Sequence, residues 1–402
     1  MSPRTLISLL SAVLLIAEAV HAEEGVKVWG LAPSFSAVTV SKVVEGLQHP
    51  WSIAWLPSGE ALITERPGRL RRLTHDTNTL SSPLPGVPAV FADGQGGLFD
   101  VAVDPHFSKN GFIYLSYAAG DPQDNRTQVT RAILDGTGLR DLRTIFRSSR
   151  GKAGSQHFGG RLLFLPDETL LVSIGDGGNP PASIDGELMR DQAQRLANHF
   201  GKVVRITRDG TPAGGGQFGT APGTQLDLWT IGHRNMQGLA LDRRTGQVYA
   251  SEHGPRGGDE VNALFGGGNF GWPVVTYGVE YSGRTITEAR SRSGMRDPLL
   301  AWVPSIAPSG LTLYRGTRFP RWQGKLFAGG LVSTDLRVIT LNSAGAAVSQ
   351  ESIPIGARVR DVREGPDGFL YLLTDESNGK VLKLADVGGE RGQVSAPLEA
   401  PR

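Results

Sequence analysis

The sequence predicts an all-β protein: a six-bladed β-propeller forming a single domain, with a loop-built site at one end of its central channel. First, the chain has 54 glycines and 25 prolines among 402 residues, and helical periodicity over long stretches is nearly absent. Second, a unit of apolar strand, turn and apolar strand recurs six times. The units begin about 50 to 80 residues apart, which leaves room for about four strands in each interval.

The six repeated units contain hairpin-type turns rich in proline, aspartate and glycine. They are Ile53–Arg66, Val101–Ala119, Leu162–Asp176, Leu239–Gly254, Leu311–Leu331 and Val362–Glu376. A propeller gathers loops of different blades around its channel, so residues that are distant in sequence can form one site. A pair of β-sandwiches or a β-helix is the alternative arrangement of such strands.

The ends of the chain differ in composition from its middle. Arg4 precedes the apolar run Leu6–Ala17, and Val20-His21-Ala22 has the pattern of a cleavage site. An uncleaved anchor is the alternative. We predict a signal peptide at residues 1–22, a catalytic propeller at residues 23–387 and a disordered tail at residues 388–402. The mature protein is then expected to be periplasmic or secreted, with no membrane insertion.

Charge and cysteine content exclude several classes of partner and chemistry. The formal net charge is +2 and no block of lysine or arginine stands out, so nucleic acid is not an expected partner. The chain has no cysteine. Disulfides, a thiolate nucleophile and metal centres bound by cysteine are therefore excluded.

A candidate general base lies in the third repeated unit. His157 stands beside the bend Gly159-Gly160, and the hairpin that follows ends at Asp176. Such a hairpin can bring Asp176 back beside His157. A carboxylate in this position holds the imidazole in one tautomer and stabilises the imidazolium, as a general base requires. A turn histidine and a turn-forming aspartate are the alternative interpretation.

Other polar clusters flank the repeated strands. Arg234, Arg358 and Arg360, directed towards one channel, would bind a polycarboxylate, and the Arg-Val-Arg spacing directs both outer side chains to one face of a strand. Gly254-Pro255, followed by Asp259 and Glu260, offers oxygen ligands of the kind that calcium prefers. Taken singly, each cluster is more often a surface loop or a salt bridge.

Five motifs together resemble one known family. They are GQGGLFDVAVDPHF, QHFGGRLLFLPD with SIGDGG, IGHRNMQGLALD, SEHGPRGGDEVN with GGNFGWP, and RVRDV. The resemblance is to the soluble aldose (glucose) dehydrogenases that depend on pyrroloquinoline quinone (PQQ), which are six-bladed propellers of the bacterial periplasm. It covers Gly46 to Leu384, nearly all of the predicted mature chain.

The resemblance implies a catalytic role for three residues. His157 would take the proton of the anomeric hydroxyl while hydride passes from C1 of the sugar to C5 of the quinone. Asp176 would orient this base. Arg234 would stabilise the charge that develops on the quinone, and Asn235 would contact the quinone oxygens beside it.

The resemblance also implies a binding set. Further PQQ contacts would be Gln95, Tyr281, Arg358 and Arg360, with His157 also lining the cofactor. The carbonyls of Gly254 and Pro255 would bind a calcium ion, and Glu260 with the carbonyl of Phe270 a second one. The substrate would contact Gln95, Gln156 and Trp302.

The chain departs from the family pattern at one cofactor position. Gly329-Gly330-Leu331-Val332 stands where glucose-oxidising members carry a lysine that contacts PQQ. We expect an aldose substrate, PQQ and Ca²⁺ as cofactors, an external electron acceptor, and a monomer or weak dimer. A calcium-dependent hydrolase resembling a lactonase, or a non-catalytic propeller that binds sugar or protein, is the alternative function.

Overall fold

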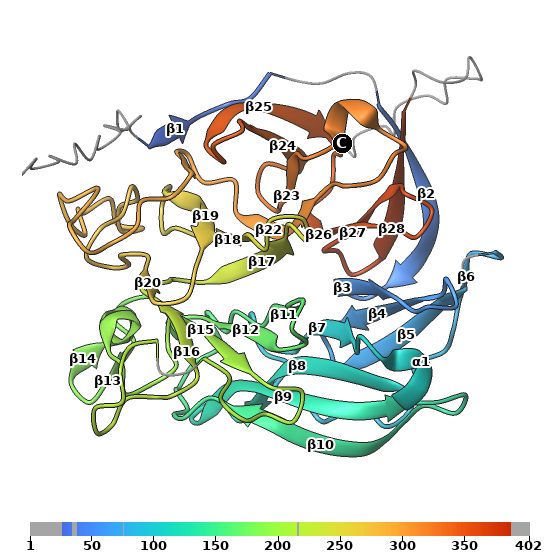
Figure 1. Ribbon diagram of the computed structural model, residues 1–402, viewed down its shortest axis with the longest axis horizontal. Helices are drawn as coiled ribbons and strands as arrows, with labels where there is room; N and C mark the ends of the chain where they lie inside the picture. The colour runs from blue at the N-terminus through green and yellow to red at the C-terminus, as the bar shows by residue number, and fades with distance from the viewer. Residues whose placement is uncertain (1–25, 34–37, 75, 215–216, 387–402) are drawn as a thin grey trace, which may run out of the picture.

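The computed structural model describes residues 26–33, 38–74, 76–214 and 217–386. It contains six sheets of four or five strands and one separate two-stranded hairpin. The six sheets are arranged around a central axis (Figure 1), so the predicted six-bladed propeller is confirmed. The predicted signal peptide and the whole of the predicted tail lie outside the described residues.

Three blades come from the first part of the chain. Blade 1 consists of β3 (Pro50–Trp55), β4 (Ala61–Glu65), β5 (Arg69–Thr74) and β6 (Thr79–Leu80). Blade 2 consists of β7 (Leu98–Val103), β8 (Phe112–Gly120), β9 (Asn125–Leu134) and β10 (Leu139–Arg147), with helix α1 (Phe107–Asn110) between its first two strands. Blade 3 consists of β11 (Leu162–Phe164), β12 (Leu170–Ile174), β15 (Lys202–Ile206), β16 (Leu228–Ile231) and β20 (Gly268–Asn269).

The other three blades complete the ring. Blade 4 consists of β17 (Met236–Leu241), β18 (Val248–Glu252), β19 (Asp259–Leu264), β21 (Leu300–Trp302) and β1 (Lys27–Trp29). Blade 5 consists of β22 (Pro308–Leu313), β23 (Leu326–Gly330), β24 (Asp335–Leu341) and β25 (Ala347–Pro354), with the 3₁₀ helix η2 (Pro320–Trp322) after its first strand. Blade 6 consists of β26 (Val359–Glu364), β27 (Leu370–Thr374), β28 (Gly379–Asp386) and β2 (Val38–Leu47).

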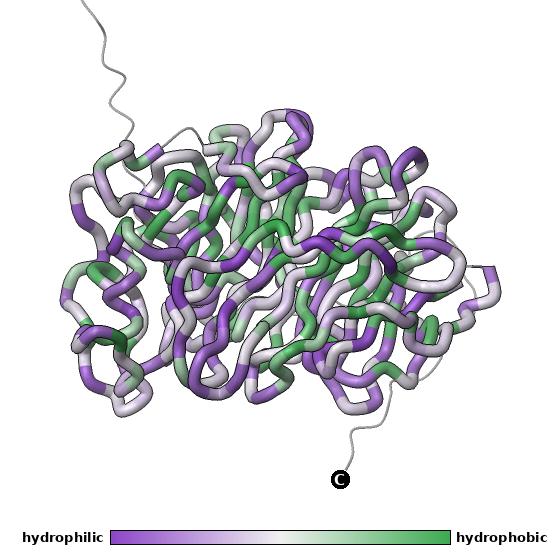
Figure 2. The backbone as a smooth tube through the Cα atoms, turned by 90° about the horizontal axis from the view of Figure 1, so that it is seen from below, coloured by the Kyte–Doolittle hydropathy of each residue, from purple (hydrophilic) through white to green (hydrophobic). Residues whose placement is uncertain are grey.

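Each repeated unit read from the sequence corresponds to the first two strands of a blade. Residues 53–66, for example, cover the second half of β3 and all of β4, which pair antiparallel with Ile53 opposite Ile63. Alternating side chains of these strands face the two neighbouring blades, and apolar clusters fill the spaces between blades. Hydrophobic residues accordingly follow the strands, and the outer loops are mostly hydrophilic (Figure 2).

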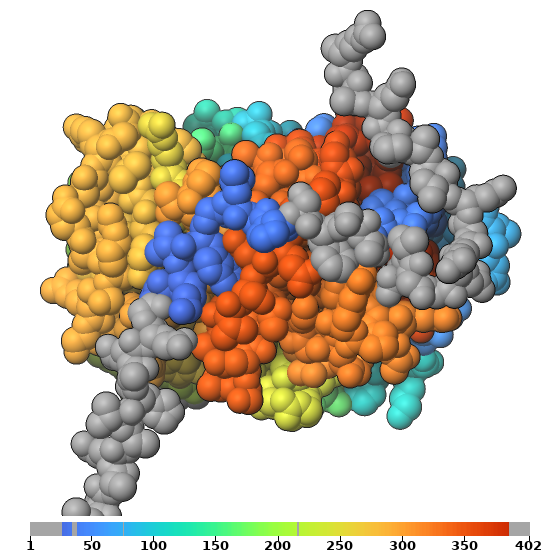
Figure 3. Space-filling view, turned by 90° about the horizontal axis from the view of Figure 1, so that it is seen from above, coloured from blue at the N-terminus to red at the C-terminus, as the bar shows by residue number. Residues whose placement is uncertain are grey.

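The ring closes through its two ends. Strand β2, from the start of the described chain, pairs antiparallel with β28, from its end, so blade 6 contains both. Figure 3 shows the N-terminal segment in blue lying against the orange and red C-terminal blades. Within the described residues, no helix is long and apolar enough to cross a bilayer.

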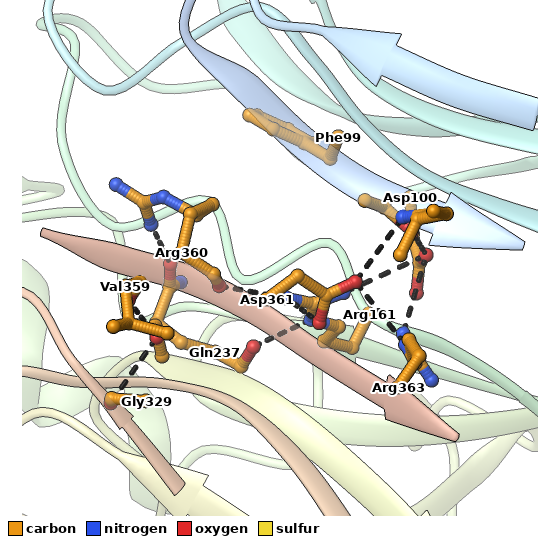
Figure 4. A network of polar contacts seen from close by, with 12 residues as sticks. Phe99, Asp100, Arg161, Gln237, Gly329, Val359, Arg360, Asp361 and Arg363 are labelled. Atoms are coloured by element: carbon orange, nitrogen blue, oxygen red, sulfur yellow. Dashed lines mark hydrogen bonds and ion pairs between the residues drawn. The ribbon is translucent and has the colours of Figure 1, made fainter. Parts of the chain in front are cut away.

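An ion network fills the middle of the channel (Figure 4). Arg161 contacts Asp361 at 3.0 Å and Asp100 at 3.7 Å, and it donates to the carbonyl of Gln237 at 2.5 Å. Arg363 contacts Asp361 at 3.1 Å and Asp100 at 3.6 Å. We call Arg161, Arg363, Asp100 and Asp361 the central ion network. It links β7 of blade 2, the residue before β11 of blade 3 and β26 of blade 6.

One irregular segment follows β12. It contains the hairpin of β13 (Ser183–Ile184) and β14 (Glu187–Leu188), then the 3₁₀ helix η1 (Met189–Gln194). The sequence lacks strand alternation here, and the segment forms a projection beside blade 3 rather than a blade strand. Its first residues lead directly away from Asp176, so they border the candidate site.

Candidate active site

A cavity of about 180 Å³ lies at one end of the channel, where the inner strands begin. We call it the channel cavity. All six blades contribute to its lining: Trp51, Arg66, Gln95, Phe99, Phe158, Gly159, Asn235, Gln237, His253, Ala307, Leu331, Arg358, Arg360 and Asp375. The sequence expectation that Arg358 and Arg360 face one pocket is confirmed. Gln95 and Asn235 are also in the lining.

The channel cavity has an excess of positive charge. Arg66, Arg358 and Arg360 line it together with a single carboxylate, Asp375. Arg360 is paired with Asp375, and the Arg358 guanidinium lies 3.8 Å from the same carboxylate. Burial alone would raise the pKa of Asp375, but the Arg360 charge and hydrogen bond lower it well below the usual value. Asp375 is therefore ionised, and three cations face one anion.

Aromatic rings form one wall of the channel cavity. The ring centres of Trp51 and Phe99 are 5.5 Å apart, and those of Phe99 and Phe158 are 5.7 Å apart. The guanidinium of Arg161, from the central ion network, lies 4.1 Å from the centre of the Trp51 ring. The rings are tilted against each other, by 48° and 38°, and together they give an aromatic wall beside several guanidinium groups. Such a wall suits an anionic ligand that contains an aromatic ring.

The predicted contact between His157 and Asp176 is present. Nδ1 of His157 lies 2.7 Å from Oδ1 of Asp176, and His157 is only 3% exposed. Asp176 also accepts hydrogen bonds from the Trp272 indole at 2.8 Å and the Gly178 amide at 3.1 Å. Because the carboxylate accepts the Nδ1 proton, the lone pair of neutral His157 is on Nε2. That nitrogen has no hydrogen-bond partner within the described part of the chain.

The backbone holds His157 in an uncommon conformation. Its φ is +49°, and its amide donates to the Gln95 side-chain carbonyl at 2.9 Å. Gly159 follows, and a Cβ there would lie 2.7 Å from the carbonyl of Ser173. The glycine of the sequence motif is thus required by close packing against the next strand.

Electrostatics favour the neutral form of His157. Burial lowers its pKa, and the nearby Arg234 charge lowers it further, while Asp176 acts in the opposite direction. Arg234 donates to the carbonyl of Gly254 at 2.6 Å and to Asn179 Oδ1 at 2.6 Å. The site therefore combines an uncharged base, an aspartate that orients it and a cation on the same side.

The sequence profile of the glucose/sorbosone dehydrogenase family matches residues 47–383. The chain belongs to this family. An aldose sugar dehydrogenase of Escherichia coli K12 is 40% identical over 359 residues, covering 87% of this chain and 93% of that protein. An uncharacterised Synechocystis protein is 50% identical over 361 residues, covering 88% and 87%.

Solved structures of family members have the same architecture. The soluble aldose sugar dehydrogenase of E. coli, in its apo-form, superposes with a TM-score of 0.81 at 38% identity, covering 87% of this chain and 99% of that one. The PQQ-bound form of an aldose sugar dehydrogenase from Streptomyces coelicolor gives a TM-score of 0.70 at 28% identity, covering 88% and 100%. The resemblance read from the motifs is confirmed.

The residues expected at the calcium sites of this family member lie in two places. The Gly254 carbonyl accepts from Arg234, so it already faces a cation. Glu260 lies on β19, the third strand of blade 4, and is therefore farther from the channel than Gly254. Burial and the nearby Glu252 raise its pKa, and Asn262, which donates to Glu260, has a buried Oδ1 with no partner. Phe270 stacks on His233, at 4.8 Å between ring centres. Across the described ranges, no group of three or more His, Asp or Glu side chains could hold a metal.

Five expected pocket residues are not in the channel-cavity lining. His157 and Arg234 lie next to lining residues in the chain, whereas Trp302, Tyr281 and Gln156 lie elsewhere. Trp302 is 0% exposed in the core of blade 4, where its indole donates to Gln350, so the expectation that it contacts substrate is wrong. Tyr281 is 61% exposed in a loop and is not part of the lining. Gln156 is exposed beside His157 and contacts Asn179.

Sequence reasoning missed four residues of the site: Arg66, His253, Asp375 and Asn179. The first three share a signal, because each directly follows the second strand of its blade and lines the channel cavity. Comparing equivalent positions of the six units would have found them. Leu331 has the same position in blade 5, so its segment, without the family's lysine, contributes an apolar wall. Asn179 has no such signal, because it lies in the irregular segment.

Proposed function

We propose that this protein is a PQQ-dependent dehydrogenase that oxidises aldose sugars at C1 to lactones. The observation that carries the proposal is the channel cavity, with three guanidinium groups against one carboxylate, beside the buried pair His157–Asp176. The names of the E. coli and S. coelicolor relatives, both aldose sugar dehydrogenases, support it.

The channel cavity fits PQQ by its charge and by its aromatic wall. PQQ is a flat tricarboxylate, and the cavity combines an aromatic wall with a net excess of two positive charges, from three arginines and Asp375. Arg358 and Arg360 would hold its carboxylates, and Arg234 with Asn235 would face its quinone oxygens. Bound PQQ supplies the hydride acceptor.

The residues of this chain would then control the proton. Nε2 of His157 takes the proton of the anomeric hydroxyl as the hydride leaves C1. Asp176 stabilises the resulting imidazolium through the 2.7 Å contact at Nδ1. Arg234 places positive charge on the side where negative charge develops. Removal of one hydride and one proton leaves the lactone, so the atoms and electrons balance.

Calcium is the second cofactor that we propose. The carbonyls of Gly254 and Pro255 would bind one ion near the cofactor; the Gly254 oxygen accepts from Arg234, so this guanidinium would have to share that oxygen or move, and the carboxylates of PQQ would offset the added charge. Glu260, supported by Asn262 and the carbonyl of Phe270, would bind another at the edge of blade 4. Neither hydrolysis nor simple sugar binding explains three arginines around a buried base, so both alternatives are less well supported.

The predicted signal peptide supports a periplasmic or secreted location. An external acceptor would there reoxidise the cofactor. We propose that the protein works as a monomer or weak dimer with a small aldose as substrate.

A reconstitution assay with a base variant tests this function. We expect the protein loaded with PQQ and calcium to reduce an artificial dye when an aldose is added. We expect His157→Ala to bind PQQ normally but to lower turnover by about 10²- to 10⁴-fold, because a general base is lost. PQQ binding is measured by titration and turnover by dye reduction.

A second histidine provides a matched control. His106 also contacts a carboxylate, Glu168 at 2.7 Å, but lies on the surface away from the channel. His106→Ala is expected to keep wild-type turnover. Turnover of the His157 variant close to that of the His106 variant would contradict the role of His157, and a wild-type protein inactive with bound PQQ would contradict the function.

A further inference from the structure

Asn179 connects the two sides of the candidate site. It follows Gly178 in the irregular segment after β12 and is half-buried. Its Oδ1 accepts a hydrogen bond from Nη2 of Arg234 at 2.6 Å. Its Nδ2 donates to Oε1 of Gln156 at 3.2 Å, and its backbone amide approaches the same oxygen at 3.3 Å. One asparagine therefore contacts both the arginine proposed to face the quinone and the glutamine next to His157.

The chemistry of its partners determines the orientation of the Asn179 amide. A guanidinium can only donate hydrogen bonds, so the oxygen of Asn179 must face Arg234. The NH₂ group of Asn179 then faces Gln156 and can only donate. The reverse orientation would place two donors against each other at 2.6 Å.

The same reasoning determines the orientation of Gln156. Its Oε1 receives two donors from Asn179, the side-chain NH₂ and the backbone amide. A backbone amide can only donate, so the carbonyl oxygen of Gln156 must point towards Asn179. Its NH₂ group is consequently directed away from Asn179. Gln156 is exposed and directly precedes His157 in the chain, so its NH₂ group faces solvent rather than the core.

We propose that Asn179 is a positioning residue that determines the polarity of the sugar side of the site. It holds the Arg234 guanidinium on one side and, on the other, makes Gln156 present hydrogen-bond donors to an acceptor oxygen of the sugar, either a hydroxyl or the ring oxygen. This inference rests on the proposed function. It specifies that the expected substrate contact of Gln156 is made by its NH₂ group as a donor, and it names Asn179 as the residue that sets this polarity.

Alternative residues at position 179 would break this arrangement in different ways. Alanine loses both side-chain contacts. Aspartate keeps an acceptor for Arg234, but its side chain cannot donate to Gln156, and its second oxygen would repel the Gln156 carbonyl oxygen. Only the 3.3 Å contact with the backbone amide then holds the glutamine, and the carboxylate favours the reversed orientation. Only a side chain with both an acceptor and a donor satisfies the two partners at once.

A double-mutant cycle tests the inference. KM for glucose is measured at saturating PQQ and calcium in wild type, Asn179→Ala, Gln156→Ala and the double variant. We expect each single substitution to raise KM about 3- to 10-fold, the range for one net hydrogen bond. The double variant should show no more than the larger single effect, because Asn179 acts on the sugar through Gln156. Asn179→Asp should raise KM as much as Asn179→Ala.

A remote asparagine serves as the control. Asn342 accepts from the amides of Ala344 and Ala346 in the turn after β24. Asn342→Ala should keep the wild-type KM. The inference is overturned if Asn179→Ala matches this control, if the single effects multiply in the double variant, or if Asn179→Asp keeps the wild-type KM. If the inference on Asn179 fails while the wild-type protein is active, the proposed function still holds. If the wild-type protein loaded with PQQ is inactive, the proposed function and the inference on Asn179 are both overturned.

Discussion

Two charged regions lie along the same channel, and they are organised differently. The central ion network contains two arginines and two aspartates, so its charges balance. The channel cavity contains three arginines and one aspartate. Arg161 is 1% exposed, whereas the Arg358 side chain is 48% exposed. One region is dry and neutral, and the other is open and positive.

The comparison distinguishes charged side chains that stabilise the fold from charged side chains that are available to bind a ligand. Buried ions are tolerated when opposite charges and hydrogen bonds surround them. Arg161 has two aspartates near it and donates to the Gln237 carbonyl, although its Nη1 and Oδ1 of Asp361 are buried without a hydrogen-bond partner. In the channel cavity the carboxylates are too few to neutralise the guanidinium groups. An anionic ligand would supply the missing negative charge. Arginines without enough counter-charge within the protein thus indicate a binding site.

The largest expected effect concerns the stability contributed by the central ion network. We expect Arg161→Met to lower the free energy of unfolding by about 3–5 kcal/mol, because Asp100 and Asp361 would remain buried with Arg363 as their one shared cation. Denaturant unfolding of the cofactor-free protein measures this value. As a control, Arg126→Met breaks a surface pair with Asp124 and should cost less than about 1 kcal/mol. If Arg161→Met and Arg126→Met lowered the free energy of unfolding equally, the central ion network would not have the structural role described here.

A smaller effect is expected for the channel cavity, and it concerns binding rather than folding. Arg358→Gln should weaken PQQ about 10- to 100-fold, because a charge-assisted hydrogen bond is lost. The free energy of unfolding without PQQ should stay near the wild-type value, since Arg358 is half exposed. Titration followed by fluorescence gives the affinity. Arg195→Gln, which removes a surface arginine paired with Glu187, should bind PQQ like wild type. Wild-type affinity in Arg358→Gln would show that the excess charge does not serve the cofactor.

The smallest expected effect is a shift in the pKa of His157, which lies at the border of the channel cavity. In the cofactor-free protein, burial and then the Arg234 charge lower the pKa of His157, so we expect a value below about 6.5. NMR titration of the imidazole protons measures it. Arg234→Gln should raise this pKa, because a positive neighbour is removed. A lowered pKa leaves His157 neutral, and able to accept a proton, at lower pH. A pKa at or above 6.5 in wild type would contradict the electrostatic contrast.

The fold was predictable because its signal is local. Each first hairpin of a blade alternates apolar residues around a recognisable turn, and all six were found from the sequence. The outer strands were not assigned, because they are more polar and their turns vary in length. The pairing of β2 with β28 could not be read, since no local pattern relates segments at opposite ends of the chain.

For the site too, contacts within one hairpin were predictable and contacts between blades were not. His157 and Asp176 are joined by one hairpin, so their contact follows from local structure. Arg66 and Asp375 come from different blades and meet only when the ring closes. Trp302 shows the opposite error: an indole beside a glycine- and proline-rich region suits a pocket wall or a core, and only packing decides between them. The family resemblance supplied roles for residues, but the structure supplied their hydrogen-bond partners.

The pairing of β2 with β28 has a consequence for how the protein is made. A ribosome delivers β2 early and β28 near the end, and the hydroxyl of Ser41 in β2 contacts the carbonyl of Lys383 across a separation of 342 residues. Until synthesis is complete, the ring is open and the unpaired edge of β2 is exposed to other chains. Closure must therefore be a late event of biogenesis. Arg358 and Arg360 lie at the start of blade 6, and this blade is incomplete until β28 has been synthesised. We therefore expect that PQQ binds only after β28 has joined the sheet.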